Sequence, residues 1–137
     1  MHAGPAGATI RPMAHDRLHD FRAHRAAGQA RLQGAGHLGI NRFLRLDTAA
    51  YEDATASGGL DAPTKELLGL VASAVLRCDD CISYHIEQCV AAGLTKAQIE
   101  DALNIALVVG GSIVIPHARR GVLFLDDCLA EREQIAP

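Results

Sequence analysis

The chain has 137 residues, a length that suits one domain with a buried core. Its net charge of −3 excludes the basic surface of a nucleic-acid-binding protein, and four cysteines are too few for a disulfide-built scaffold. No apolar run reaches the roughly 18 residues that span a bilayer, and no secretion signal opens the sequence. We therefore expect a cytoplasmic protein that binds neither nucleic acid nor membrane.

The first part of the chain predicts an arm followed by two helices. Residues 1–12 are rich in Gly, Ala and Pro without periodicity, so we interpret them as a flexible N-terminal arm before a single domain over residues 13–137. Residues 14–33 are a polar helix candidate with a thin apolar stripe. Residues 40–57 are predicted to form a second helix, which Gly58-Gly59 closes.

The third predicted helix begins near Asp61, a residue suited to the N-cap, with Pro63 in its first turn. Its apolar residues follow the i, i+3, i+4, i+7 spacing of one helix face as far as Val75. Glu66 lies at the edge of that stripe, which predicts a partly buried carboxylate.

Three further helices are predicted in the second half of the chain. One covers about residues 79–92, and the next begins with a capping box formed by Thr95 and Gln98. Ser112 is predicted to cap the last helix, where Pro116 is tolerated because it falls in the first turn. Since no segment alternates like a strand, we expect an all-α fold of about six helices.

The last two helices carry apolar residues on nearly every side, including the run at residues 102–109. A helix that is apolar all round needs partners all round, and one small core does not supply them. The surplus predicts an obligate oligomer.

Four residues carry the chemistry: Glu66, Cys78, Cys81 and His85. On a helix, the two cysteines and the histidine fall within one wedge of the surface, and cysteines three residues apart lie within disulfide range. The histidine follows the second cysteine by one turn and can reach its sulfur. The spacing predicts a thiol redox site in which Glu66 and His85 handle protons.

Several other residues admit plainer interpretations. Asp79 and Asp80 suit the capping of a helix start, while Cys89 and Cys128 are expected to pack in the core. His15 and His19 have the spacing of metal ligands, but we interpret them as part of a solvated polar face. His117 is expected to serve a surface or capping role, although it lies near the predicted site.

With these residues, the chain resembles the carboxymuconolactone decarboxylase superfamily in its AhpD-like, alkylhydroperoxidase branch. Glu66, Cys78, Cys81 and His85 match the pattern E-x(11)-C-x-x-C-x-x-x-H position for position. The likeness covers residues 40–125. The chain has Asp80 where AhpD itself often has a histidine.

The resemblance implies an all-α fold, usually trimeric or hexameric, and a thiol peroxidase or disulfide oxidoreductase. Cys81 would attack the hydroperoxide, Glu66 and His85 would take up its proton, and Cys78 would resolve the sulfenic acid into a disulfide. A dithiol reductant of the lipoyl type would restore the thiols, and no tightly bound cofactor or metal is implied.

Other functions remain open on the sequence. A lactone decarboxylase-like enzyme would use Glu66 and His85 alone, and a redox-sensing oligomeric module would show little turnover. The same four side chains could also bind zinc, although structural zinc sites usually draw their ligands from two separate knuckles.

Overall fold

The computed structural model describes residues 14–137, and the predicted arm at residues 1–12 lies outside them. The described residues form six α-helices and no strand: α1 (Ala14–Gly34), α2 (Leu38–Ala50), α3 (Ala62–Val75), α4 (Asp79–Ala91), α5 (Lys96–Gly110) and α6 (Ile115–Ile135). Short 3-10 helices, η1 (Thr55–Ser57) and η2 (Ser112–Val114), precede α3 and α6. The predicted all-α fold is confirmed. No helix in this part of the chain is long and apolar enough to cross a membrane.

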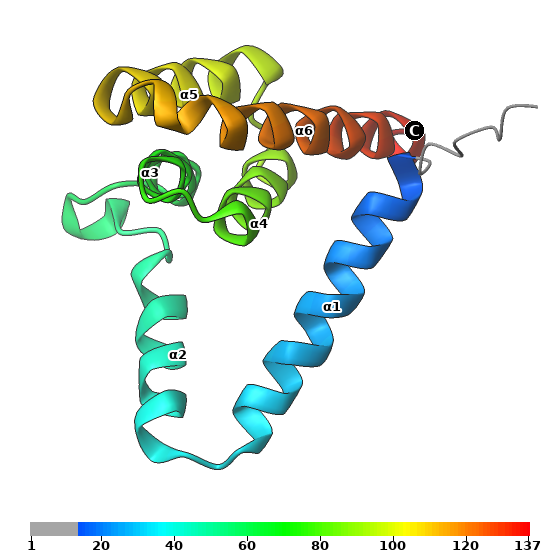
Figure 1. Ribbon diagram of the computed structural model, residues 1–137. Helices are drawn as coiled ribbons and strands as arrows, with labels where there is room; N and C mark the ends of the chain where they lie inside the picture. Colours follow the sequence, from blue (N-terminus) through cyan, green and yellow to red (C-terminus); the bar gives the residue numbers. More distant parts are fainter. Residues whose placement is uncertain (1–13) are drawn as a thin grey trace, which may run out of the picture.

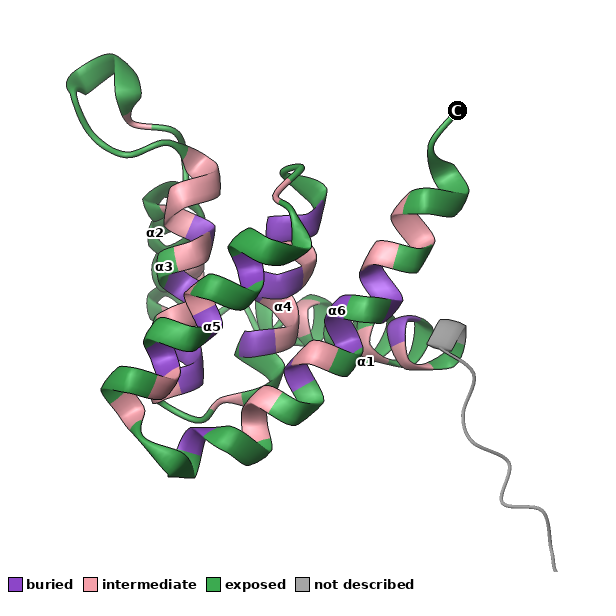
Figure 2. Ribbon diagram, turned by 90° about the horizontal axis from the view of Figure 1, so that it is seen from above, coloured by how far each residue is buried: buried purple, intermediate pink, exposed green. Residues whose placement is uncertain are grey.

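The helices divide into a bundle and a projecting pair. Helix α3 packs against α4 and α5, and α4 packs against α6. Helices α1 and α2 form a V that extends from this bundle (Figure 1). The buried residues concentrate on the inward faces of the bundle helices, whereas α2 buries none (Figure 2). The fully buried large side chains are Leu70, Ile82, Ile86, Ile99, Leu125, Val114 and Cys89.

Helix α1 is fixed to α6 by both apolar and charged contacts. The rings of Phe21 and Phe124 meet edge to face, with centroids 5.1 Å apart. Arg17 makes a bidentate ion pair with the buried Asp127, at 2.6 and 2.8 Å. Bidentate pairs of this kind fix orientation as well as distance. The aromatic contact and the ion pair together hold α1 in place, with its middle facing α4.

Two helix boundaries differ from the sequence predictions. The predicted helix over residues 40–57 ends at Ala50, because Asp53 draws the next amides into η1 by accepting from the Thr55 N–H at 2.9 Å. Ser112 does not cap α6; it opens η2 instead, and Val114 precedes α6 without any side-chain cap.

Three predicted signals for helix starts are confirmed. Asp61 accepts from the Thr64 N–H at 2.8 Å, and Thr95 and Gln98 form the predicted capping box. Pro116 falls at the start of α6, as predicted.

Candidate functional site

The turn between α3 and α4 sets the position of Cys78. The Cys78 N–H donates to the Ser73 carbonyl, and the Arg77 N–H donates to the Ala74 carbonyl, both at 3.0 Å. These two bonds define a Schellman motif, which requires a left-handed residue after the helix, here Arg77 at φ 60°. The motif closes α3, and only residues 76–78 separate that helix from α4.

Cys78 is the N-cap of α4, and its sulfur accepts from the Cys81 N–H at 3.3 Å. Asp79 and Asp80 lie in the first turn of this helix start, as predicted, but the N-cap position itself is taken by the cysteine sulfur. An amide donor and the positive end of the helix dipole favour a thiolate at such a sulfur.

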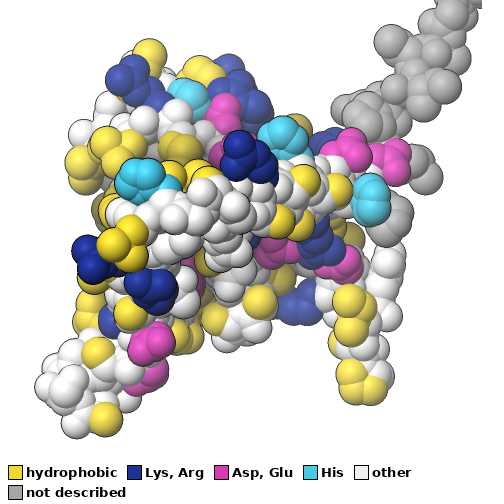
Figure 3. All heavy atoms as spheres, turned by 90° about the horizontal axis from the view of Figure 1, so that it is seen from below, with side chains coloured by type: hydrophobic (Ala, Val, Ile, Leu, Met, Phe, Trp, Pro, Cys, Tyr) yellow, Lys and Arg dark blue, Asp and Glu magenta, His cyan; other side chains and the backbone are white. Residues whose placement is uncertain are grey.

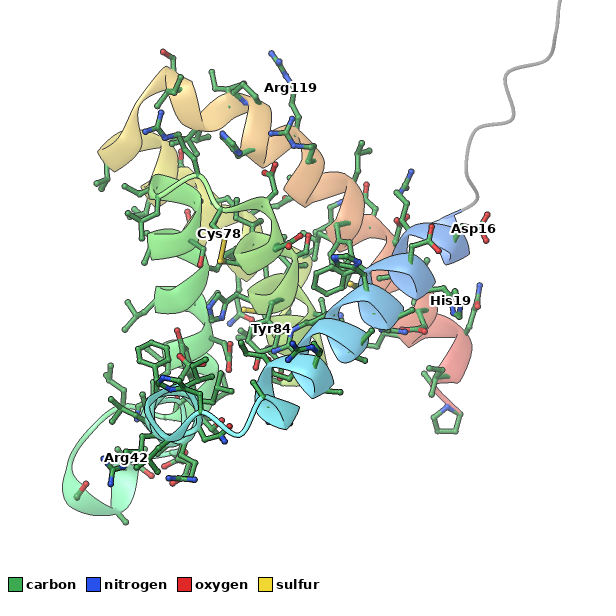
Figure 4. All side chains as sticks on the ribbon, turned by 60° about the horizontal axis from the view of Figure 1, so that its bottom comes forward. Asp16, His19, Arg42, Cys78, Tyr84 and Arg119 are labelled. Carbon is green, nitrogen blue, oxygen red and sulfur yellow. A yellow bond between two sulfur atoms is a disulfide. The ribbon has the colours of Figure 1, made fainter. Side chains whose placement is uncertain are left out.

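Cys78 and Cys81 are joined by a disulfide, with their Cα atoms 5.2 Å apart, within the range predicted from helical spacing. The two differ in access: Cys81 is exposed, whereas Cys78 is half-buried. Figure 4 shows the disulfide at the start of α4. An attacking reagent would therefore meet Cys81 first.

Glu66 and His85 form a buried pair between α3 and α4. The Glu66 Oε2 atom lies 2.8 Å from His85 Nδ1, and the two residues are only 9% and 7% exposed. The predicted partial burial of Glu66 is confirmed. Gly69 makes this packing possible, because a Cβ atom there would lie 2.5 Å from His85 Cε1.

Tyr51 is a site residue that the sequence reasoning missed. Its hydroxyl lies 3.4 Å from His85 Nε2, and the two rings are 5.2 Å apart. Burial, with the nearby Glu66 carboxylate, raises the pKa of the Tyr51 phenol. The sequence placed Tyr51 inside the predicted helix over residues 40–57, whereas in the structure it is the C-cap of α2.

Cys81, His85 and Tyr51 line one cavity of about 360 Å³ between α1, α2 and α4. Cys81, Tyr84 and His85 line its α4 wall, together with Asp80. The remaining lining residues come from the V: Phe21, His24, Arg25, Asp47 and Tyr51. The Arg25 guanidinium lies 4.2 Å from the centre of the Tyr84 ring, which faces α1 (Figure 4).

A second polar cluster joins the first turn of α4 to α6. Asp79 accepts from His117 at 2.8 Å and from Arg120 at 3.0 Å, both on α6. Burial by itself raises the pKa of the Asp79 carboxyl, but the hydrogen bonds from His117 and Arg120 outweigh burial and lower that pKa below its usual value. His117 thus lies beside the site and fixes the first turn of α4 to α6.

The remaining candidates do not join the site. Cys89 and Cys128 are buried, as predicted, and burial raises the pKa of each thiol to about 12. His19 is exposed on α1, and the side chain of His15 lies outside the described ones. Among the described residues, no group of three or more His, Cys, Asp and Glu side chains is arranged to hold a metal ion.

Comparison with known proteins gives one family. The sequence profile of the carboxymuconolactone decarboxylase family matches residues 41–122. An uncharacterized protein of Cupriavidus necator is 30% identical over 73 residues, which is 53% of this chain and 65% of that protein. The uncharacterized protein 4 in the cox locus of Paracoccus denitrificans is 29% identical over 85 residues, covering 62% and 73%.

Two crystal structures of one Thermotoga maritima protein are similar to this chain. The first is 50% identical, with a TM-score of 0.78, and covers 85% of this chain and 98% of that one. The second, at 51% identity and a TM-score of 0.72, covers 84% and 93%; it describes a carboxymuconolactone decarboxylase family protein with a suggested part in the antioxidative response. A Legionella pneumophila protein, 22% identical with a TM-score of 0.73, shares the fold over 82% of this chain and 97% of its own.

Proposed function

The chain belongs to the carboxymuconolactone decarboxylase family, and we propose that it is a thiol-dependent peroxidase of the AhpD type. It would reduce hydroperoxides through the Cys78–Cys81 dithiol. One observation carries the proposal: the exposed Cys81 shares a cavity with His85, whose other ring nitrogen is held by the buried Glu66. A reactive sulfur, a base and an orienting carboxylate are the parts that thiol chemistry needs.

The proposed cycle begins on the reduced enzyme. The Cys81 thiol gives its proton to the His85–Glu66 pair, and the thiolate attacks the terminal oxygen of the hydroperoxide. An S–O bond forms and the O–O bond breaks, which leaves a sulfenic acid on Cys81 and an alkoxide that takes up a proton to become the alcohol. The sulfur is oxidised and the peroxide is reduced.

Cys78 then closes the cycle. Its thiolate attacks the Cys81 sulfenic acid, the S–S bond forms, and water leaves. The amide of Cys81 and the helix dipole favour the Cys78 thiolate for this step, and because Cys78 is half-buried whereas Cys81 is exposed, the peroxide meets Cys81 first. An external dithiol of the lipoyl type would reduce the disulfide by thiol–disulfide exchange and be oxidised in turn.

Two further observations support a redox role over decarboxylation. The suggested antioxidative part of the Thermotoga maritima protein, at 51% identity, agrees with a thiol peroxidase. A decarboxylase that used Glu66 and His85 alone would have no use for a disulfide whose Cys81 lines the cavity.

The test is hydroperoxide consumption driven by dihydrolipoamide. We expect Cys81→Ser to abolish turnover, and Cys78→Ser to stop after one turnover with a sulfenic acid that dimedone traps on Cys81. Cys128→Ser is the matched control, because that buried thiol lies outside the cavity and should leave turnover unchanged. Full turnover by Cys81→Ser would contradict the proposal.

A further inference from the structure

His85 has a hydrogen-bonding neighbour at each ring nitrogen. Glu66 lies at Nδ1 and the Tyr51 hydroxyl lies at Nε2. We infer that Tyr51 is a catalytic residue which donates the proton to the oxygen that leaves when the hydroperoxide is cleaved. This inference rests on the proposed peroxidase function and names a residue that the Glu-Cys-Cys-His pattern does not contain.

The hydrogen bond to Glu66 decides which way the Tyr51 proton points. A carboxylate only accepts, so His85 must carry its hydrogen on Nδ1, which leaves a lone pair on Nε2. In the resting enzyme Nε2 therefore accepts from the Tyr51 O–H. The order Glu66, His85, Tyr51 is a single chain of hydrogen bonds running from the buried interior to the cavity.

When His85 takes up the Cys81 proton, the hydrogen bond between His85 Nε2 and the Tyr51 hydroxyl reverses its direction. Nδ1 is already protonated, so the proton settles on Nε2, which then donates to the Tyr51 oxygen. The Tyr51 hydrogen is released to turn toward the cavity. Proton uptake by the base thus makes a donor available at the moment when the O–O bond breaks and an alkoxide needs a proton.

The surroundings of Tyr51 suit a donor. Its pKa is raised by burial and by the Glu66 carboxylate, so the phenol keeps its proton at neutral pH. Lys65 fixes the end of α2, because its ammonium donates to the carbonyls of Ala50 and Glu52 on either side, at 2.9 and 2.6 Å. Tyr51 and Cys81 line the same cavity.

The balance of the step is simple. Cys81 loses its thiol proton to Nε2 and forms the S–O bond; the O–O bond breaks, and Tyr51 protonates the departing alkoxide. The tyrosinate regains its proton from His85 Nε2, and the pair returns to its resting form. The thiol proton ends on the alcohol, and no co-reactant is needed beyond the hydroperoxide.

The experiment compares two oxidants that need the proton to different degrees. tert-Butyl hydroperoxide releases a strongly basic alkoxide, whereas peroxybenzoic acid releases weakly basic benzoate. Disulfide formation in the pre-reduced enzyme is followed by rapid quench, alkylation and mass spectrometry. We expect Tyr51→Phe to slow disulfide formation by tert-butyl hydroperoxide about 10²-fold, the size of a general-acid contribution. The same variant should slow disulfide formation by peroxybenzoic acid far less.

A structural role would give a different result. Tyr84→Phe removes the other tyrosine hydroxyl of the cavity, from a ring that also contacts His85. This variant should change the rates of disulfide formation with the two oxidants by the same factor. Equal factors for both oxidants in Tyr51→Phe would overturn the inference. If that variant fails to fold, replacement of Tyr51 by 3-fluorotyrosine, a stronger acid of nearly the same size, must alter the ratio of the two rates; an unchanged ratio overturns the inference.

The two proposals fail separately. Absence of disulfide formation with either oxidant in the wild-type enzyme would contradict the peroxidase function itself. Rapid disulfide formation that depends on Cys81 but shows no oxidant-specific effect of Tyr51→Phe would remove only the role of Tyr51.

Discussion

Gly69 is the residue on which the position of His85 depends. Replacement by Ala normally stabilises a helix by roughly 0.5–1 kcal/mol, yet here the new methyl would lie 2.5 Å from the imidazole. The ring must move, which breaks its bond to Glu66 and leaves a buried carboxylate without that partner. We expect Gly69→Ala to lower the free energy of unfolding by about 1–3 kcal/mol and to abolish activity.

The matched control is Gly28→Ala in α1, where a Cβ atom meets nothing within 4 Å. That variant should gain roughly 0.5–1 kcal/mol of stability and keep full activity. Urea unfolding and peroxide turnover measure both variants. A stable, active Gly69→Ala enzyme would show that the ring does not need this space.

The four cysteines divide into two chemical classes. Burial raises the pKa of Cys89 and Cys128 to about 12, so at pH 8 only about 10⁻⁴ of either thiol is ionised. We expect iodoacetamide to label Cys78 and Cys81 in the folded, reduced protein and to spare the other two. Labelling should extend to Cys89 and Cys128 only in denaturant, as peptide mass spectrometry will show; their rapid labelling in the native protein would contradict the core assignment.

At the scale of elements, α3 and α4 are joined by a left-handed residue that carries a side chain. Arg77 holds φ 60° in the Schellman motif that sets Cys78, whereas Gly93 holds the same place after α4, at φ 83°. A left-handed conformation costs a residue with a Cβ about 1–2 kcal/mol. We therefore expect Arg77→Gly to stabilise the protein by about 1 kcal/mol, after the entropy of the added glycine is counted.

Gly93→Ala makes the opposite change, from glycine to a residue with a Cβ atom, at the equivalent position after α4. Open space surrounds that position, so only the backbone conformation opposes the change, and we expect a loss of about 1 kcal/mol. Thermal unfolding at one protein concentration compares the two variants. A destabilised Arg77→Gly would mean that contacts of the arginine outweigh the strain.

The sequence predicted helices well wherever local capping chemistry decides the ends. Asp61, Thr95 and Gln98 act as predicted because each satisfies amides within its own turn. Prediction from the sequence failed where local signals compete. Asp53 forms its own turn, so α2 ends earlier than predicted. As a result Tyr51 lies at a helix end beside His85. The Asp79–His117–Arg120 cluster joins residues far apart in sequence, and nothing in the spacing predicts it.

At the scale of the whole molecule, apolar side chains remain uncovered. Hydrophobic side chains reach the surface at several places on the face drawn in Figure 3. On α5, Ile105, Val108 and Val109 share one helix face and are 50%, 75% and 67% exposed. Leu76, at the end of α3, is 77% exposed. Soluble monomers rarely leave several such groups together on one helix face, so the exposed face of α5 suits the contact between subunits that the sequence predicted.

A charge on this face separates a subunit contact from a merely apolar surface. In an isolated chain, Val108→Asp replaces an exposed valine and should change stability little. In an oligomer it buries an unpaired carboxylate, at a cost of about 3–5 kcal/mol per site. We expect analytical ultracentrifugation to show wild-type oligomers and dissociated Val108→Asp chains with native helical content. Ala56→Asp places the same charge on the exposed surface of a different element, η1, and should leave assembly intact. Equal masses for Val108→Asp and the wild type would assign the subunit contact, if one forms, to another face.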